Sequence, residues 1–217
     1  MRVIKILSIL LFSITLASCG GGGCGATTAF GAIAYSACDK SEENPFQKYF
    51  GTWYFCEENI KTKIEFMANG SRGVKYSYSE SVYNGPSCTG SVAGVYVEDG
   101  YTIGILNGKV LANFPAQSVF SHAAEVDRVT FSTPNMVASL TGSGTSGENI
   151  CYSYVDTMGP HSGCVPYDST ISEAVSEGGL HLSADGQYLS LFTVENGVMK
   201  FGSVASKDSN FDPSQLN

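Results

Sequence analysis

Residues 61–78 read KTKIEFMANGSRGVKYSY, and their pattern indicates the fold class of the whole chain. Charged and apolar side chains alternate before Asn69-Gly70, and apolar or aromatic side chains alternate with polar ones after it. A period of two is typical of a strand with one buried face, and Asn-Gly supplies the positive φ angles of a tight turn. The stretch therefore predicts a β-hairpin whose inward-facing residues are Ile64, Phe66, Val74, Tyr76 and Tyr78.

The same turn signals recur along the chain. Asn-Gly or Asp-Gly pairs lie at residues 69–70, 84–85, 99–100, 107–108, 185–186 and 196–197, and each predicts a tight hairpin. Further strands are predicted over residues 51–56, 90–97, 101–106, 109–114, 128–132, 136–140, 150–155, 187–194 and 198–205. The one helix of any length is predicted over residues 169–177. We therefore predict an all-β fold, an antiparallel meander that closes into a small barrel, with a β-sandwich as the alternative.

Composition narrows the possible partners. The chain has 217 residues, 12 Lys plus Arg, 20 Asp plus Glu, and a net charge of −8. Nucleic-acid binding needs a clustered excess of basic residues, and electrostatic docking on anionic headgroups needs the same. The balance of charge therefore argues against both kinds of partner.

The N-terminus resembles a bacterial lipoprotein signal. Residues 1–19 read MRVIKILSILLFSITLASC, with two basic residues followed by an apolar run that is too short for a transmembrane helix. Leu16-Ala17-Ser18-Cys19 resembles the lipobox of bacterial lipoproteins. That resemblance implies that residues 1–18 are removed, that Cys19 is acylated, and that the lipid anchors the protein in the membrane. The alternative is an ordinary secretory signal with an incidental cysteine.

The lipoprotein resemblance also predicts a location and a division of the chain. The residue after Cys19 is Gly20 rather than Asp, which favours the outer membrane of the bacterial envelope over the inner one. Residues 19–44 hold the lipidated cysteine and a Gly-rich stretch that predicts a flexible tether. Residues 45–217 hold the β-domain.

Six cysteines remain once Cys19 is assigned to lipid. An even number in an exported chain indicates disulfides, and several connectivities are possible. Sequence order favours the local pairs Cys24–Cys38, Cys56–Cys88 and Cys151–Cys164. The competing interpretation is metal binding, but the chain has no CxxC pair and His161 lies near Cys164 alone. We therefore expect no metal site.

The stretch Phe46-Gln-Lys-Tyr-Phe-Gly-Thr-Trp-Tyr54 resembles the opening motif of lipocalins, with Gly51 and Trp53 at its Gly-x-Trp positions. The resemblance implies that Trp53 closes one end of the barrel and that a basic residue near the last strand stacks on it. No arginine follows Arg128, so the stacking residue would be Lys200 or Lys207. Equally, a lone tryptophan can anchor any β core.

The lipocalin resemblance also implies a function. The five inward-facing residues of the first hairpin would line a site for a small hydrophobic or amphipathic ligand, or they would fill a solid core. In the second case the protein is an interaction module, such as a periplasmic inhibitor or a subunit of an envelope complex. The Cys151–Cys164 disulfide would then hold an exposed loop against a protein partner.

Catalytic signals are weak. The sequence has no HExxH, Gly-x-Ser-x-Gly or P-loop motif, and His122, His161 and His181 are dispersed. The adjacent carboxylates Glu98 and Asp99 precede a glycine, which predicts a solvated strand end. We therefore expect no enzyme activity and no cofactor.

Overall fold

The computed structural model describes residues 43–114 and 123–212. In these ranges the chain forms fourteen strands and two 3-10 helices, and no helix is long and apolar enough to cross a membrane. The helices are η1 (Gln47–Tyr49) and η2 (Pro86–Cys88). The strands are β1 (Gly51–Glu57), β2 (Ile60–Asn69), β3 (Gly73–Tyr83), β4 (Val92–Asp99), β5 (Thr102–Asn113), β6 (Ala123–Thr133), β7 (Met136–Thr141), β8 (Thr145–Ser146), β9 (Asn149–Asp156), β10 (Gly159–Pro166), β11 (Thr170–Ile171), β12 (Ala174–Leu182), β13 (Tyr188–Glu195) and β14 (Val198–Ser206).

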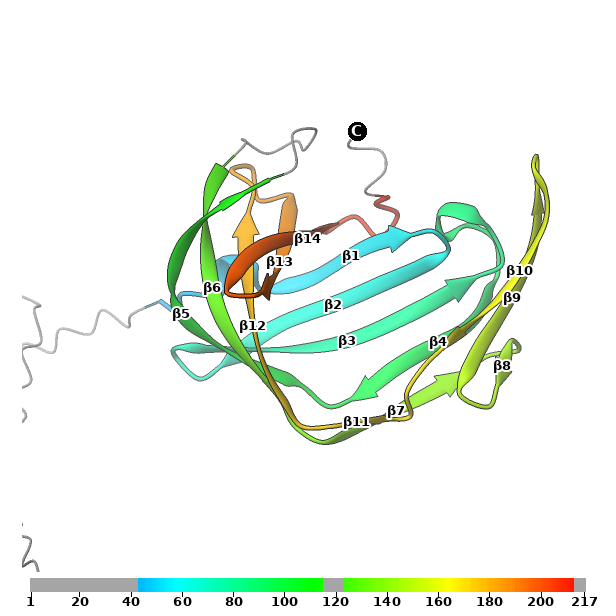
Figure 1. The fold of residues 1–217 in the computed structure, drawn as a ribbon, viewed down its shortest axis with the longest axis horizontal. Helices are drawn as coiled ribbons and strands as arrows, with labels where there is room; N and C mark the ends of the chain where they lie inside the picture. Colours follow the sequence, from blue (N-terminus) through cyan, green and yellow to red (C-terminus); the bar gives the residue numbers. More distant parts are fainter. Residues whose placement is uncertain (1–42, 115–122, 213–217) are drawn as a thin grey trace, which may run out of the picture. The chain divides into compact units, whose positions relative to one another are not determined.

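Eight of these strands close into an antiparallel barrel (Figure 1). Their order around the ring is β1, β2, β3, β5, β6, β12, β13 and β14, and β14 pairs with β1 to complete the circle. Consecutive barrel strands are neighbours, so the topology is a meander with two excursions, one through β4 and one through β7 to β11. The predicted all-β barrel is therefore confirmed, and the chain does not form the alternative sandwich.

The hairpin of residues 61–78 forms as predicted. β2 pairs with β3 over ten residues, and this register places Ile64 opposite Tyr78 and Phe66 opposite Tyr76. Gly70 has φ +68°, which the turn requires. Ile64, Phe66 and Val74 are buried in the main core of the barrel, and Tyr76 and Tyr78 pack against that core.

The strands on one side of the barrel continue beyond it as an open sheet (Figure 1). The first half of β3, Gly73–Tyr76, pairs with β5, and its second half, Ser79–Tyr83, pairs with β4. β4 and β5 therefore lie end to end along the same neighbouring strand, β3. The hairpin predicted at Asp99-Gly100 is wrong, because this segment is a bend within one line of strand.

The hairpin predicted at Asn107-Gly108 is also wrong. β5 is a single strand, and its pairing with β6 passes from Leu106 opposite Val129 to Lys109 opposite Asp127. Two residues of β5 are thus left without partners, which is a bulge, and Gly108 takes φ +88° within it. An Asn-Gly pair whose glycine takes a positive φ suits a bulge as well as a turn, so the local sequence did not distinguish them.

The helix predicted over residues 169–177 is wrong as well. This segment forms β11 and the first part of β12, which pair with β7 and β6 respectively. The adjoining Gly178-Gly179 disfavours helix, whereas Val175 favours a strand. Pairing with strands distant in sequence decided the outcome, and that pairing leaves no local signal.

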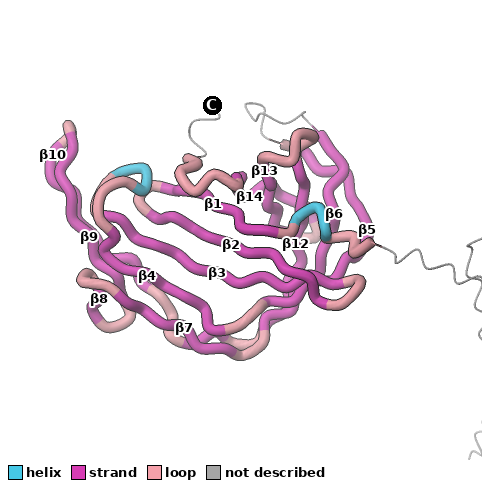
Figure 2. Tube along the Cα trace, turned by 180° about the vertical axis from the view of Figure 1, so that it is seen from behind, coloured by secondary structure: helices cyan, strands magenta, loops and turns pink. Residues whose placement is uncertain are grey.

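The outer end of the open sheet carries a small second sheet, β8–β9–β10. β9 and β10 form a long hairpin that Figure 2 shows projecting from the end of the molecule opposite the barrel. Ile150 at its base is fully buried with Val82, Ala93 and Tyr96 of the open sheet. β10 was not predicted, because its sequence, GPHSGCVP, is rich in Gly and Pro.

Two of the three predicted disulfides are confirmed. Cys56 bonds to Cys88, which joins the end of β1 to η2, and Cys151 bonds to Cys164 across the β9–β10 hairpin. The predicted lipidation site Cys19 and the predicted pair Cys24–Cys38 lie outside the described residues.

Candidate ligand-binding cleft

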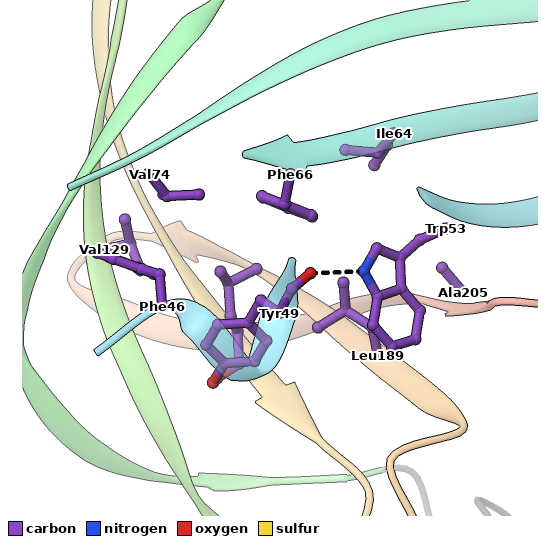
Figure 3. Close-up of a cluster of buried hydrophobic side chains, with 10 residues drawn as sticks. Phe46, Tyr49, Trp53, Ile64, Phe66, Val74, Val129, Leu189 and Ala205 are labelled. Carbon is purple, nitrogen blue, oxygen red and sulfur yellow. Dashed lines mark hydrogen bonds between the residues drawn. The ribbon is translucent and has the colours of Figure 1, made fainter. Parts of the chain in front are cut away.

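One end of the barrel is filled by aromatic side chains (Figure 3). Phe46, Tyr49 and Trp53 are almost completely buried there, and the indole Nε1 of Trp53 donates a hydrogen bond to the backbone oxygen of Tyr49 at 2.8 Å. The Asn44 side-chain amide donates to backbone oxygens of Gly70 and Gly73, in the turn between β2 and β3. The short helix η1 is thus fixed across the barrel end, which we call the closed end.

A buried polar group holds η1 against the opposite wall. The Tyr49 hydroxyl lies 2.7 Å from the Asp127 carboxylate and 2.9 Å from the backbone oxygen of Leu180, and Lys48 forms an ion pair with Asp127 at 2.7 Å. Burial raises the pKa of Tyr49 far above its ordinary value, and the hydrogen bond and charge of Asp127 raise it further. Tyr49 is therefore a neutral donor at any physiological pH.

The cation predicted to stack on Trp53 is Lys207. Its ammonium nitrogen lies 5.1 Å from the centre of the indole ring, within the range of a cation–π contact. Lys200, the other candidate, forms an ion pair with Glu195 instead. The arrangement that the lipocalin resemblance implied at this end is thus present in the geometry.

The barrel wall is incomplete toward the other end. β13 pairs with β12 only along Gly178–Leu182, so residues Ala174–Glu177 of β12 are paired only with β6. β1 and β14 are paired at one position, Tyr54 with Ser206. Hydrogen bonding therefore closes the ring near the closed end and leaves a gap in the wall farther along.

A second apolar cluster accounts for this gap. Phe192 of β13 and Met199 of β14 pack with Val126 and Ala112. Val126 precedes the inward-facing Asp127, so alternation places it on the outer face of the barrel. The β13–β14 hairpin is thus bent outward over the neighbouring strands.

The gap opens into an apolar cleft of about 610 Å³ inside the barrel. This volume lies within the range of roughly 300–1,000 Å³ that is usual for small-molecule sites. Four of the five predicted lining residues, Ile64, Phe66, Tyr76 and Tyr78, contribute to it. Val74, the fifth, is fully buried in the adjoining core and does not line the cleft. The other lining residues were not predicted: Phe131, residues 175–180 and residues 191–194.

The cleft has no basic residue among its described lining. Glu177 is its one charged side chain, and this carboxylate forms an ion pair with Arg128. The remaining polar lining consists of Ser176, Thr193 and the two tyrosine hydroxyls. The cleft therefore offers apolar surface and hydrogen-bonding groups, with no positive charge.

A group of acidic and aromatic residues adjoins the cleft at Tyr78. The group, which we call the carboxylate–tyrosine cluster, consists of Tyr78, Glu80, Tyr96, Glu98 and Tyr167. Glu80 accepts hydrogen bonds from the hydroxyls of Tyr78 and Tyr167, the latter at 2.8 Å. Glu98 accepts one from Tyr96 at 3.4 Å, and the rings of Tyr96 and Tyr167 stack with centroids 4.6 Å apart.

Burial and negative charge shift the pKa values of this cluster upward. Burial is the largest cause for Tyr78, whose pKa is also raised by the charges of Glu80 and Glu98. The same causes raise the pKa of Tyr96 to about 12. Burial raises the pKa of the Glu98 carboxyl; the hydrogen bond from Tyr96 opposes this shift, and the charge of Glu80 adds to it. The expectation of a solvated Glu98 is wrong, because the side chain is half-buried.

The histidines form no catalytic arrangement within the described part of the chain. His161 lies 2.9 Å from Asp156 and stacks on Tyr154 near the tip of the β9–β10 hairpin. Cys164, the nearest cysteine on that strand, is held in a disulfide. His181 contacts the backbone oxygen of Glu125, and His122 lies outside the described residues. In the same ranges no group of three or more His, Cys, Asp or Glu residues is placed to hold a metal ion.

The chain matches no protein-family model, and no curated protein or solved structure matches it significantly. Its likeness to lipocalins therefore rests on the opening motif and on the barrel itself.

Proposed function

We propose that this protein is a lipid-anchored lipoprotein of the bacterial cell envelope, whose lipocalin-like barrel binds a small hydrophobic or amphipathic ligand. The observation that carries the proposal is the apolar cleft of about 610 Å³ within a barrel whose other end is filled. Catalysis forms no part of the proposed function, and no cofactor or metal is invoked.

The cleft lining supports an apolar ligand energetically. Transfer of each methylene group from water to such a lining contributes about 0.8 kcal/mol. Phe66, Tyr76 and Phe131 offer aromatic surface in contact with one another, since Tyr76 lies 5.6 Å from Phe66 and 5.7 Å from Phe131 between ring centres. An aromatic or alkyl group fits this surface, and the hydroxyl groups suit a polar end.

Filling the cleft is expected to abolish binding. Ser176 lines the cleft from the part of β12 that lacks β13 as a neighbour, so Ser176→Trp should occupy the site while leaving the core intact. We expect the affinity for 4-phenylbutanol, an uncharged aromatic alcohol, to fall by about tenfold or more. Isothermal titration calorimetry on the full chain in lipid nanodiscs, with empty nanodiscs as the blank, measures this change.

Ser209→Trp is the matched control, because Ser209 is exposed and lies away from the cleft lining. It should bind 4-phenylbutanol like the wild type. Equal binding by wild type and Ser176→Trp would contradict the assignment of the cleft as the ligand site.

The proposed lipid anchor predicts an all-or-none result. Cys19→Ser removes the sulfur that would be acylated, so metabolic labelling with palmitate should be lost completely. The variant should also accumulate with residues 1–18 attached, which gel mobility detects. A Cys24→Ser variant should be labelled like the wild type. Undiminished labelling of Cys19→Ser would contradict the lipoprotein assignment.

A second candidate function is favoured by the β9–β10 hairpin. Its tip exposes Met158 and Val155, with 85% and 77% of their surface accessible, and the Cys151–Cys164 disulfide braces its strands. Exposed apolar side chains on a braced hairpin suit contact with another protein. The protein would then be an interaction module, such as a periplasmic inhibitor or a subunit of an envelope complex, without a ligand.

A further inference from the structure

We propose that the ligand of the barrel cleft is an amphipathic amine and that Glu98 is the counter-ion of its ammonium group. This inference rests on the proposed ligand-binding function and specifies the chemical class of the ligand. It follows from the position of the carboxylate–tyrosine cluster, from the hydrogen bonds within that cluster, and from the sign of the surrounding charges.

The cluster lies on the same face of the sheet as the cleft lining. Alternate residues of a strand share a face, so Tyr76, Tyr78 and Glu80 of β3 all point inward. Glu80 is paired with Tyr96 on β4, and Glu98 is two residues further along that strand on the same face. Tyr78 both lines the cleft and donates a hydrogen bond to Glu80. The charge of Glu98 also acts on Tyr76 and Tyr78, two residues of the cleft lining. The cluster therefore adjoins the cleft at Tyr78, within electrostatic reach of a ligand bound there.

The two carboxylates differ in the number of hydrogen bonds that their oxygens accept. Both oxygens of Glu80 accept a tyrosine hydroxyl, one from Tyr78 and one from Tyr167. Among the described residues, Glu98 receives a single hydrogen bond, from Tyr96, and this bond is long at 3.4 Å. Glu98 is thus the acceptor with capacity left for a donor brought by a ligand.

Charge around the cluster favours a cation. Glu80 from β3 and Glu98 from β4 face it, and the negative charge of Asp168, which follows β10, also acts on Tyr96. The other titratable groups that face it are the tyrosines at positions 76, 78, 96 and 167. No lysine or arginine contributes to the described lining of the adjoining cleft. An anionic ligand such as a fatty acid would therefore meet repulsion, whereas an ammonium group would meet attraction and aromatic faces.

Three ligands with one apolar skeleton test the inference: 4-phenylbutylamine, 4-phenylbutanol and 4-phenylbutyrate. At pH 7.5 the first is a cation, the second is neutral and the third is an anion. Calorimetry on the full chain in nanodiscs should give an affinity for the amine about tenfold above that for the alcohol, and weaker binding still for the carboxylate. Lowering the pH through the raised pKa of Glu98 should weaken binding of the amine and leave the alcohol unchanged.

Glu98→Gln identifies the counter-ion. It should lower amine affinity by about tenfold, to the level of the alcohol, and leave alcohol affinity within about twofold. Glu65→Gln is the matched control, since Glu65 faces outward on β2 beside Lys63 and its replacement makes the same change in net charge. It should leave both affinities unchanged.

Each result separates the two proposals. Tighter binding of the carboxylate than of the amine, or an amine preference that survives in Glu98→Gln, would overturn the inference while the proposed function stands. Failure of all three ligands to bind would overturn the proposed function and this inference together. The ligand series and the pH series use wild-type protein, so the inference is tested even if Glu98→Gln folds poorly.

Discussion

Trp53→Ala is expected to lower the free energy of unfolding by about 3–5 kcal/mol, the usual cost of truncating a buried tryptophan. Trp53 is fully buried at the closed end of the barrel. Its loss leaves a cavity beneath η1 and removes the hydrogen bond that the indole donates to the backbone oxygen of Tyr49. It also removes the contact with the Lys207 ammonium group, which contributes about 0.5–1 kcal/mol at exposed sites.

Urea denaturation followed by far-ultraviolet circular dichroism measures the effect of Trp53→Ala. A domain of this kind has about 5–15 kcal/mol of stability in total, so the variant falls close to the limit of folding. Trp53→Phe retains much of the buried ring and should lose less, which keeps the comparison measurable. Tyr101→Ala is the control, because the Tyr101 side chain is 45% exposed and its removal should cost at most about 1 kcal/mol. An equal loss in Trp53→Ala and Tyr101→Ala would contradict the role of Trp53 as the centre of the closed end.

Local pattern was sufficient for those parts of the fold in which neighbours in sequence are neighbours in space. The hairpin around Asn69-Gly70 and the turn at Asn196-Gly197 both lie where alternating residues and turn residues predicted them. The Cys56–Cys88 disulfide was predicted from sequence order for the same reason, since a meander brings the end of β1 close to the end of β3. Short-range contacts leave their signal in the local sequence.

Partners distant in sequence left no comparable signal. The bend at Asp99-Gly100 resembles a turn in sequence. The strand nevertheless continues from β4 into β5, because β4 and the first part of β5 both pair with β3. The sequence therefore predicted a solvated strand end for Glu98. In the fold, the second half of β3 lies beside Glu98 and brings Glu80 into the same cluster. The spacing of Glu98 two residues after Tyr96 predicts that both side chains share one face of the strand. It predicts an inward-facing carboxylate only when Tyr96 is already known to face inward.

Only one wall of the candidate site could be predicted from the sequence, for a related physical reason. The wall formed by β2 and β3 followed from alternation, but the opposite wall depends on how β13 leaves β12. Gly179 is paired with Phe192 next to the last pair of these strands, and a β-carbon on it would be 2.5 Å from a methyl group of Val126. Only glycine permits this close packing, which lets Met199 and Val126 meet over the backbone. A Gly-Gly pair in a strand can indicate such a close approach, but it does not indicate which residues approach.

Closure at one end and opening at the other have a common origin in this barrel. The residues that pack at the closed end hold the start of β1 and the end of β14 together, where Tyr54 pairs with Ser206. Beyond that point the hairpin of β13 and β14 follows the outer cluster around Phe192 rather than the interior. Beyond this point β13 and β14 no longer cover the barrel interior, and the cleft lies where they would otherwise pack. Packing at the closed end therefore holds the barrel together while its wall stays open farther along.

Replacing Cys56 and Cys88 together with alanine is expected to lower the free energy of unfolding by about 3–4 kcal/mol in the chain-entropy model. The bond spans 32 residues of sequence, and both half-cystines are buried. It fixes the end of β1, a barrel strand, next to η2, which follows the open-sheet half of β3. Its loss should therefore weaken the barrel and the sheet as one cooperative unit.

The Cys151–Cys164 bond provides the matched comparison for this prediction. It spans 13 residues, links two directly paired residues of one hairpin, and leaves Cys164 exposed. The loop that it closes is short, and replacing its cysteines with alanine removes little buried side-chain volume. We therefore expect a smaller loss of global stability, with faster amide hydrogen exchange confined to β9 and β10. Denaturation and hydrogen exchange on the two double-alanine variants measure the difference. A larger global loss in the Cys151/Cys164 variant would mean that the hairpin, rather than the β1–η2 junction, holds the domain together.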